Sequence, residues 1–169
     1  EGADYAEVFD QANALGYLES DPSLDVDGID AAAKAAILAE LAFHTRVTLA
    51  HVYCEGSRNV TKADLGSARD MGFGIKLLAI AELVCTEEKE DGIVVRVHPA
   101  MIPLHHPLAN VRGSFNAVFV HAEAAGEMMF YGRGAGGDGG VPWEAVLRVR
   151  ADRNQKASVR HRGAPGKRA

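Results

Sequence analysis

A lysine in an unusually apolar run is the first residue whose setting suggests chemistry. Between Ala31 and Phe43 the only charged side chains are Lys34 and Glu40. At helical spacing Asp30 lies one turn before Lys34, so the sequence offers the ammonium a carboxylate partner. An amine beside a carboxylate in apolar surroundings is suited to giving and taking a proton. The alternative is a lysine that extends to the surface along its alkyl chain and carries no chemistry.

An acidic segment stands directly ahead of this run. It holds Glu19, Asp21, Asp25 and Asp27, and a ligand carrying an ammonium group would bind well among them. The positive end of a helix dipole and the needs of a turn also account for such acids. Asp27 is the residue we expect to cap the helix N-terminus. The segment lacks the alternating oxygen ligands and the closing Glu of an EF-hand, so we expect no calcium site.

Two further patterns point to sites less strongly. His98, His105 and His106 suggest a metal, but adjacent histidines point in different directions and no Cys or acid completes a ligand set. We therefore expect no metal. The glycines of residues 132–137 match the spacing G-x-G-x-x-G, but no helix of a βαβ unit follows them, which excludes a dinucleotide fingerprint.

Apolar spacing and turn residues predict the elements that position these groups. Helices are expected over residues 5–15, 29–43 and 62–71, the last capped by Thr61, and strands over residues 47–53, 75–83, 93–98 and 117–123. Residues 16–28 are expected to form a loop. The 29–43 helix is apolar almost all round, so we expect it to be buried on most sides.

The order of these elements predicts the fold class. Helices and strands do not alternate regularly, and the short acidic connection over residues 86–92 suits antiparallel neighbours. We therefore predict an α+β fold with a mainly antiparallel or mixed sheet covered by helices. The 169 residues, 47% of them hydrophobic, suffice for one well-buried domain.

The charge distribution argues against nucleic acid as a partner. The net charge of −5 conceals an acidic body, since ten Lys and Arg against twenty-two Asp and Glu precede Arg148. Binding to phosphates requires a clustered basic surface instead. The basic residues 141–169 lack apolar periodicity, and we expect them to form a disordered tail.

Cysteine usage and hydropathy bear on location. The two cysteines, Cys54 and Cys85, are too few to indicate a disulfide framework, which favours a reducing, cytoplasmic setting. No apolar run approaches the roughly 20 residues needed to cross a bilayer, and the N-terminus has no secretory pattern, so we expect no membrane partner. The chain opens at Glu1 directly into a helical pattern, which suggests a fragment of a longer protein.

Residues 12–34 resemble the signature of the homoserine dehydrogenases, with every spacing kept. The matching residues are Ala12, Gly16, Tyr17, Glu19, Asp21-Pro22, Asp25-Val26, Gly28, Asp30 and Lys34. Leu18 departs from the pattern by standing where the family has a small residue. The resemblance continues through Ala-Phe-His-Thr-Arg (42–46), Tyr-Cys-Glu-Gly (53–56), Ile-Lys-Leu-Leu-Ala-Ile (75–80), Val-His-Pro-Ala (97–100) and Phe-Asn-Ala-Val-Phe-Val (115–120). It covers residues 1–137 and is closest to actinobacterial members.

The resemblance implies a reaction and roles for these side chains. Homoserine dehydrogenases interconvert L-homoserine and L-aspartate 4-semialdehyde with NAD(P), in the pathway that leads to threonine, methionine and isoleucine. On the matching positions, Lys34 would donate and accept the proton at the reacting oxygen, and Glu19 and Asp30 would hold the amino acid substrate. The remaining implied roles are cofactor contacts for Gly16 and Gly134 and support of the site by Asp25.

The resemblance also implies how the chain is organised. Residues 1–140 would be the catalytic and dimerisation domain of a homodimeric enzyme, and residues 141–169 a divergent tail. Apolar strands over residues 75–83 and 117–120 independently favour a dimer. The nucleotide-binding domain, which distinguishes NAD from NADP, would precede Glu1, so we expect the isolated chain to be inactive. The alternative is a catalytically incompetent dimerisation or substrate-binding module.

Overall fold

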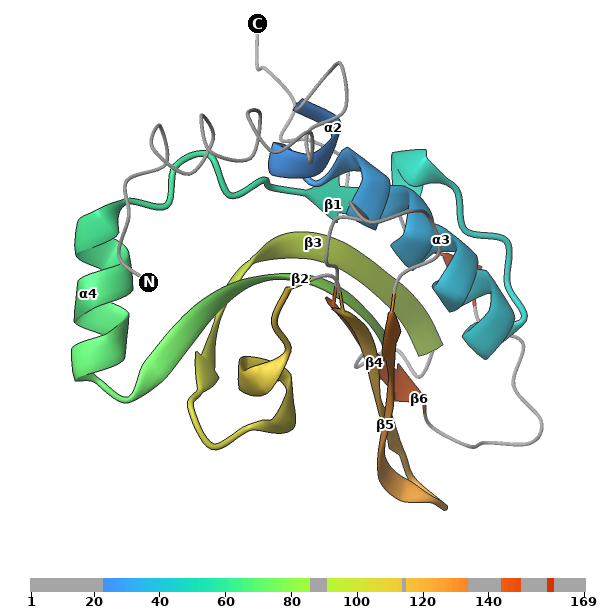
Figure 1. Ribbon diagram of the computed structural model, residues 1–169. Coiled ribbons are helices and arrows are strands. Elements are labelled where there is room, and N and C mark those ends of the chain that lie inside the picture. The colour runs from blue at the N-terminus through green and yellow to red at the C-terminus, as the bar shows by residue number, and fades with distance from the viewer. Residues whose placement is uncertain (1–22, 86–90, 114, 134–143, 150–157, 160–169) are drawn as a thin grey trace, which may run out of the picture.

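The computed structural model describes residues 23–85, 91–113, 115–133, 144–149 and 158–159. The helices are α2 (Ser23–Val26), α3 (Ile29–Phe43), α4 (Lys62–Asp70) and the short 3-10 helices η1 (Leu49–His51) and η2 (Pro107–Asn110). The strands are β1 (Val52–Cys54), β2 (Phe73–Cys85), β3 (Asp91–Pro103), β4 (Phe115–Ala122), β5 (Gly126–Arg133), β6 (Glu144–Val149) and β7 (Ser158–Val159). Figure 1 shows the strands in one curved sheet, with α3 across its convex face and α4 at one end.

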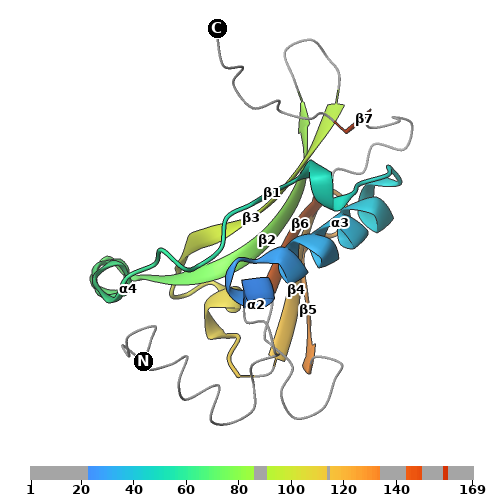
Figure 2. The ribbon, with the colours of Figure 1, turned by 90° about the horizontal axis from the view of Figure 1, so that it is seen from above.

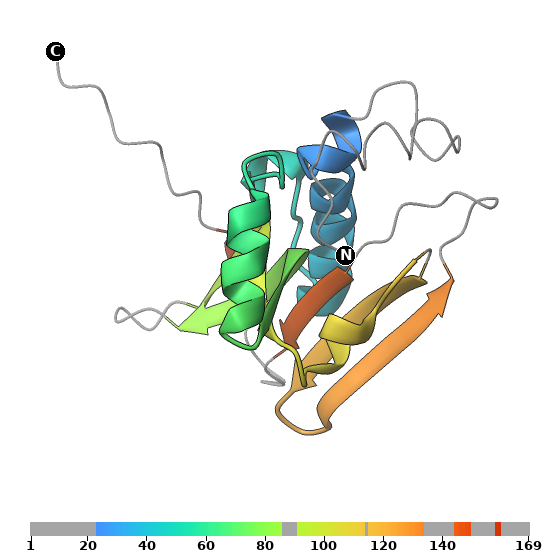
Figure 3. The ribbon, with the colours of Figure 1, turned by 60° about the vertical axis from the view of Figure 1, so that its left-hand side comes forward.

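The sheet is mixed, with the order β1-β3-β2-β6-β4-β5, and β7 pairs with β3. Strands β2 and β3 form a long antiparallel ladder that runs from Phe73 opposite Pro103 to Cys85 opposite Asp91. Strands β4 and β5 are also antiparallel, whereas β6 lies parallel to both of its neighbours (Figure 3). The predicted α+β class with a mixed sheet covered by helices is confirmed.

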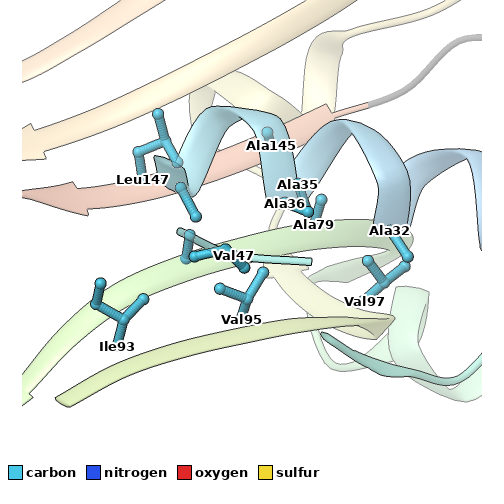
Figure 4. Packing of buried hydrophobic residues seen from close by; sticks show 12 residues of the cluster. Ala32, Ala35, Ala36, Val47, Ala79, Ile93, Val95, Val97, Ala145 and Leu147 are labelled. Carbon is cyan, nitrogen blue, oxygen red and sulfur yellow. The ribbon is translucent and has the colours of Figure 1, made fainter. Parts of the chain in front are cut away.

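Helix α3 lies across one face of the sheet (Figure 2), and the residues that it buries there are alanines. The buried members are Ala32, Ala35, Ala36 and Ala39. Alanine is the best helix former, and its short side chain lets the helix axis approach the strands closely. Figure 4 shows Ala32, Ala35 and Ala36 on the side of α3 that faces the sheet, where β3 carries Val95 and Val97. A larger side chain on this face would overpack the contact, at a cost of about 1–3 kcal/mol.

A second cluster fills the concave face of the sheet. It joins Leu78, Ile102, Val111 and Phe119 to Leu108, which comes from η2. Alternate residues of one strand serve the two clusters, because successive side chains point to opposite faces of a sheet. The Nζ of Lys76 also donates a hydrogen bond to the carbonyl oxygen of Val111 at 2.6 Å, which ties the segment after η2 to strand β2.

Most predicted elements are confirmed, and some need correction. The 29–43 helix, the helix capped by Thr61 and the strands that became β2, β3 and β4 are present. The expected 16–28 loop contains helix α2, and the expected 47–53 strand is the 3-10 helix η1 followed by the short strand β1. Strand β5 was not predicted. The expected helix over residues 5–15 lies outside the described residues.

The expected disorder of residues 141–169 is wrong for two segments. Residues 144–149 form strand β6, between β2 and β4, and residues 158–159 form β7. The physical reason is the apolar alternation around Ala145 and Leu147, whose side chains are buried in the core beneath α3. Basic neighbours obscured that pattern in the sequence. The division at residue 140 stays a prediction. No helix in the described ranges is long and apolar enough to cross a membrane.

Candidate functional site

Lys34 and Asp30 form an ion pair on the first turns of α3. The Nζ of Lys34 lies 2.5 Å from Oδ2 of Asp30, as expected for residues four apart on one helix. Asp30 stands in the first turn, where the positive end of the helix dipole favours a carboxylate. The predicted contact between these two side chains is therefore confirmed, whereas their chemical roles stay predictions.

The pair is open to solvent and therefore to a ligand. The side chains of Lys34 and Asp30 are 37% and 46% exposed. The expectation that α3 is buried on most sides is wrong, since Ile37 and Leu41 are 61% and 68% exposed. An apolar pattern indicates that a side chain favours burial, but it does not show whether the same chain or another molecule buries it. A polar ligand can reach the ammonium and the carboxylate from the solvent side.

The start of α3 differs from the sequence prediction. Gly28, and not Asp27, occupies the N-cap position, with a left-handed backbone at φ 76° and no side-chain cap. The left-handed backbone favours glycine at this position, and a Cβ there would also lie tightly against β3, 3.1 Å from Cγ1 of Val97. The carboxylate of Asp27 binds the guanidinium of Arg58 instead, through two hydrogen bonds of 3.0 Å.

Residues 54–58, called here the 54–58 loop, are hydrogen-bonded to the turn before α3. The backbone N–H of Ser57 donates to the carbonyl oxygen of Val26 at 2.8 Å, and the thiol of Cys54 donates to the carbonyl oxygen of Asp27 at 3.2 Å. Loss of water around the sulfur raises the pKa of the Cys54 thiol, and the negative charge of Asp27 raises it further. Sequence reasoning missed this loop as part of the site, although the Tyr-Cys-Glu-Gly motif was a visible signal.

The other predicted site residues are placed only in part. Asp25 lies in α2, immediately before the turn that leads into α3. Glu19, Gly16 and Gly134 lie outside the described residues. Of the predicted catalytic, substrate and cofactor residues, the structure describes Lys34 and Asp30, and it brings these two together.

Two of the three histidines singled out in the sequence, His98 and His106, make structural contacts. Nδ1 of His106 accepts a hydrogen bond from the backbone N–H of Leu108 at the start of η2, and its ring packs against Phe119 with centroids 4.8 Å apart. Nδ1 of His98 lies 2.9 Å from the carbonyl oxygen of Pro99. In the part of the chain that the structure describes, no three His, Cys, Asp or Glu side chains are grouped as metal ligands.

A cavity of about 350 Å³ lies between α4, the 54–58 loop and the sheet. Its lining includes Glu55 and Gly56 from the loop, Met71 from the end of α4, and Ile75 and Met101 from the sheet. Lys34 and Asp30 do not line it. The cavity therefore does not include the ion pair, although the 54–58 loop both lines the cavity and contacts the turn before α3.

Comparison with known proteins points to one family. The sequence model described as homoserine dehydrogenase matches residues 1–140. The homoserine dehydrogenase of Mycobacterium tuberculosis is 61% identical over 136 residues, and that of Corynebacterium glutamicum is 58% identical over 136 residues. Each alignment covers 80% of this chain and 31% of the relative, so the chain spans about a third of the length of these relatives.

Solved structures give the same result. A homoserine dehydrogenase from Thiobacillus denitrificans superimposes with a TM-score of 0.71 at 38% identity, over 82% of this chain and 31% of that one. A hyperthermophilic archaeal homoserine dehydrogenase, solved in complex with NADPH, superimposes with a TM-score of 0.54 at 25% identity, over 82% of this chain and 37% of that one. The fold described above is therefore shared with proteins of this name.

Proposed function

The chain belongs to the homoserine dehydrogenase family, and from that premise we propose that it is the substrate-binding and catalytic segment of an NAD(P)-dependent homoserine dehydrogenase. The reaction is the interconversion of L-homoserine and L-aspartate 4-semialdehyde, in which the nicotinamide carries the hydride. The segment contributes side chains that bind the amino acid and move a proton at its C4 oxygen.

The observation that carries the proposal is the ion pair between Lys34 and Asp30. Its nitrogen and oxygen are 2.5 Å apart on a rigid helix, and both side chains are reachable from solvent. An ammonium so placed donates a proton to an oxygen that gains negative charge, and the resulting amine takes the proton back in the reverse direction. Lys34 is therefore the proposed acid and base at the C4 oxygen.

Acidic side chains of the segment suit the substrate's ammonium group. Asp30 remains 46% exposed beside Lys34, so its carboxylate can be reached by a second cation. We assign substrate binding to Asp30 and Glu19, and we assign Asp25 a supporting role at the junction that leads into α3. These roles follow from the family signature on residues 12–34.

The described residues do not by themselves form a dinucleotide site. They contain no glycine-rich turn between a strand and a helix of the kind that cradles a pyrophosphate. NADPH is bound by the archaeal relative, which supports a nicotinamide cofactor for the full-length enzyme. The proposal covers NAD and NADP alike and gives the family's glycine contacts to Gly16 and Gly134.

A chimeric enzyme tests the proposal. In this chimera the chain replaces the matching 136-residue segment of the full-length Mycobacterium tuberculosis relative. We expect oxidation of homoserine coupled to reduction of NAD or NADP, and we expect loss of that activity in Lys34→Met. A folded, dimeric chimera without turnover would reject the catalytic assignment and favour a noncatalytic dimerisation or substrate-binding module. Equilibrium dialysis of the 169-residue chain with homoserine then distinguishes these two modules.

A further inference from the structure

The 54–58 loop packs against the turn that connects α2 to α3 and is hydrogen-bonded to it. We propose that this loop sets the position of the Lys34–Asp30 pair, with Gly56 and Arg58 as its positioning residues. This inference rests on the function proposed above, because it concerns the same pair. It adds residues that are distant in sequence to the two helical neighbours Lys34 and Asp30.

Arg58 contributes orientation more than stability. Its Nε and one terminal nitrogen each donate a 3.0 Å hydrogen bond to a different carboxylate oxygen of Asp27, which is the two-point geometry that a guanidinium provides. The side chains of Arg58 and Asp27 are 55% and 40% exposed, and exposed pairs contribute little to folding. A two-point contact nevertheless fixes the angle of the turn relative to the loop.

Gly56 brings two backbones into direct contact. A Cβ at this position would lie 2.4 Å from the Cα of Asp27 and 2.4 Å from the carbonyl oxygen of Val26. Both atoms belong to the backbone, so no side-chain rotation relieves the overlap. Any residue larger than glycine must therefore push the turn away from the loop and stretch the 2.8 Å hydrogen bond from Ser57 to Val26.

The contact is connected to the sheet on one side and to the helix on the other. The backbone N–H of Glu55 donates to the carbonyl oxygen of Val97 at 2.7 Å, which fixes the loop on β3. The carbonyl oxygen of Gly28 accepts the N–H of Ala32 at 2.9 Å in the first turn of α3. Lys34 follows two residues later on the same rigid helix. A displaced turn therefore displaces the ammonium relative to anything bound opposite it.

Two glycine substitutions test the steric part of the proposal in the chimera. Gly56→Ala should lower kcat by at least ~10-fold, since a misplacement of about 1 Å can cost 10²-fold in rate. Gly66→Ala in α4 is the matched control, because a Cβ there meets no atom within 4 Å. Equal kcat values for the two variants, measured per mole of folded enzyme, would overturn the proposal.

An arginine series tests the two-point contact. Arg58→Ala should lower kcat and raise the solvent deuterium isotope effect, because a misplaced Lys34 makes proton transfer slower relative to the other steps. Arg58→Lys should recover part of the loss, and the exchange of Asp27→Arg with Arg58→Asp should recover more. A purely structural role would lower the melting temperature and leave the isotope effect unchanged. That pattern, or the same kcat in Arg58→Ala as in the exposed control Arg69→Ala, would overturn the inference.

Hydrogen exchange on the 169-residue chain separates this inference from the proposed function. Arg58→Ala should speed exchange of the Ser57 and Ala32 amides relative to Arg69→Ala, whether or not the chimera is an enzyme. An inactive unsubstituted chimera would reject the proposed function while the exchange data still decide on the loop. Unchanged exchange at both amides would reject the loop's role in holding the turn.

Discussion

Lys34→Met removes the ammonium and keeps an unbranched side chain, and we expect it to reduce turnover without unfolding the protein. General acid–base catalysis typically contributes 10²–10⁴-fold, so kcat of the chimera should fall by roughly that factor. The KM for homoserine should change much less, because the proton moves in the transition state and not on binding. Steady-state kinetics at saturating cofactor measure both quantities.

The effect on stability should be small for a reason visible in the structure. The pair is 37% and 46% exposed, and exposed pairs four residues apart on a helix contribute about 0.3–0.5 kcal/mol. Asp30 stays in the first turn, where the helix dipole favours its charge. Because 1 kcal/mol shifts the melting temperature of a chain of this size by about 2–4 °C, we expect a change below about 2 °C.

Lys76→Met is the matched control, since it makes the same substitution on the other side of the sheet. Lys76 donates its 2.6 Å hydrogen bond to the carbonyl oxygen of the buried Val111, and bonds from charged donors contribute about 1.5–3 kcal/mol. This variant should melt several degrees lower and keep kcat nearly intact. Near-normal kcat in Lys34→Met, or a collapse of its fold, would refute the reasoning and leave Lys34 as a surface lysine.

Three further outcomes follow from particular contacts. The hydrogen bonds from the Thr61 side chain and backbone lower the pKa of Asp64, so its carboxylate stabilises the fold above the usual Asp range and this contribution is lost as the pH falls through the lowered value. As the pH is lowered, the melting temperature of Thr61→Ala should therefore fall less than that of the wild type. Parallel curves of melting temperature against pH would contradict this. Because the pKa of Cys54 is raised, iodoacetamide at pH 8 should alkylate it more slowly than a free cysteine, as measured by peptide mass spectrometry. Asp27→Asn removes a charge that raises this pKa, so alkylation should be faster in that variant. Light scattering at micromolar concentration should give the mass of a dimer. Phe130→Asp should shift the folded chain towards monomer, since Phe130 is 62% exposed on the edge strand β5. A monomeric wild-type chain would contradict the predicted dimer.

The features that sequence reasoning obtained correctly are local ones. The bounds of α3 follow from an alanine-rich run that ends at His44, whose left-handed backbone stops the helix. The contact of Lys34 with Asp30 depends only on helical periodicity. Thr61 caps α4 because its side chain meets a residue three positions later, Asp64. Each of these contacts joins residues within about one helical turn, so the chain's own geometry specifies it.

Two features that sequence reasoning missed, the place of β6 and the exposed surface of the sheet, are nonlocal. Strand β6 enters the sheet between β2 and β4, and its pairing depends on partners that come much earlier in the chain. The surface available to a second copy also differs from the one expected, because apolar residues of β2 pack into clusters on both faces of the sheet, whereas β5 leaves apolar side chains exposed. Alternation identifies a strand, but register and order determine which surface remains for a partner.

The start of α3 shows how these two kinds of information combine in the site. Sequence alone made Asp27 a plausible helix cap, since an acid before a helix commonly fills that role. In the structure Gly28 takes the cap position, because its left-handed backbone lets the helix begin close against β3, and this frees the Asp27 carboxylate to bind Arg58 from a segment 31 residues away. The local pattern thus identifies the amine and its carboxylate partner. In our proposal the position of this pair depends on Gly56 and Arg58, and helical periodicity gives no connection between these two residues and Lys34.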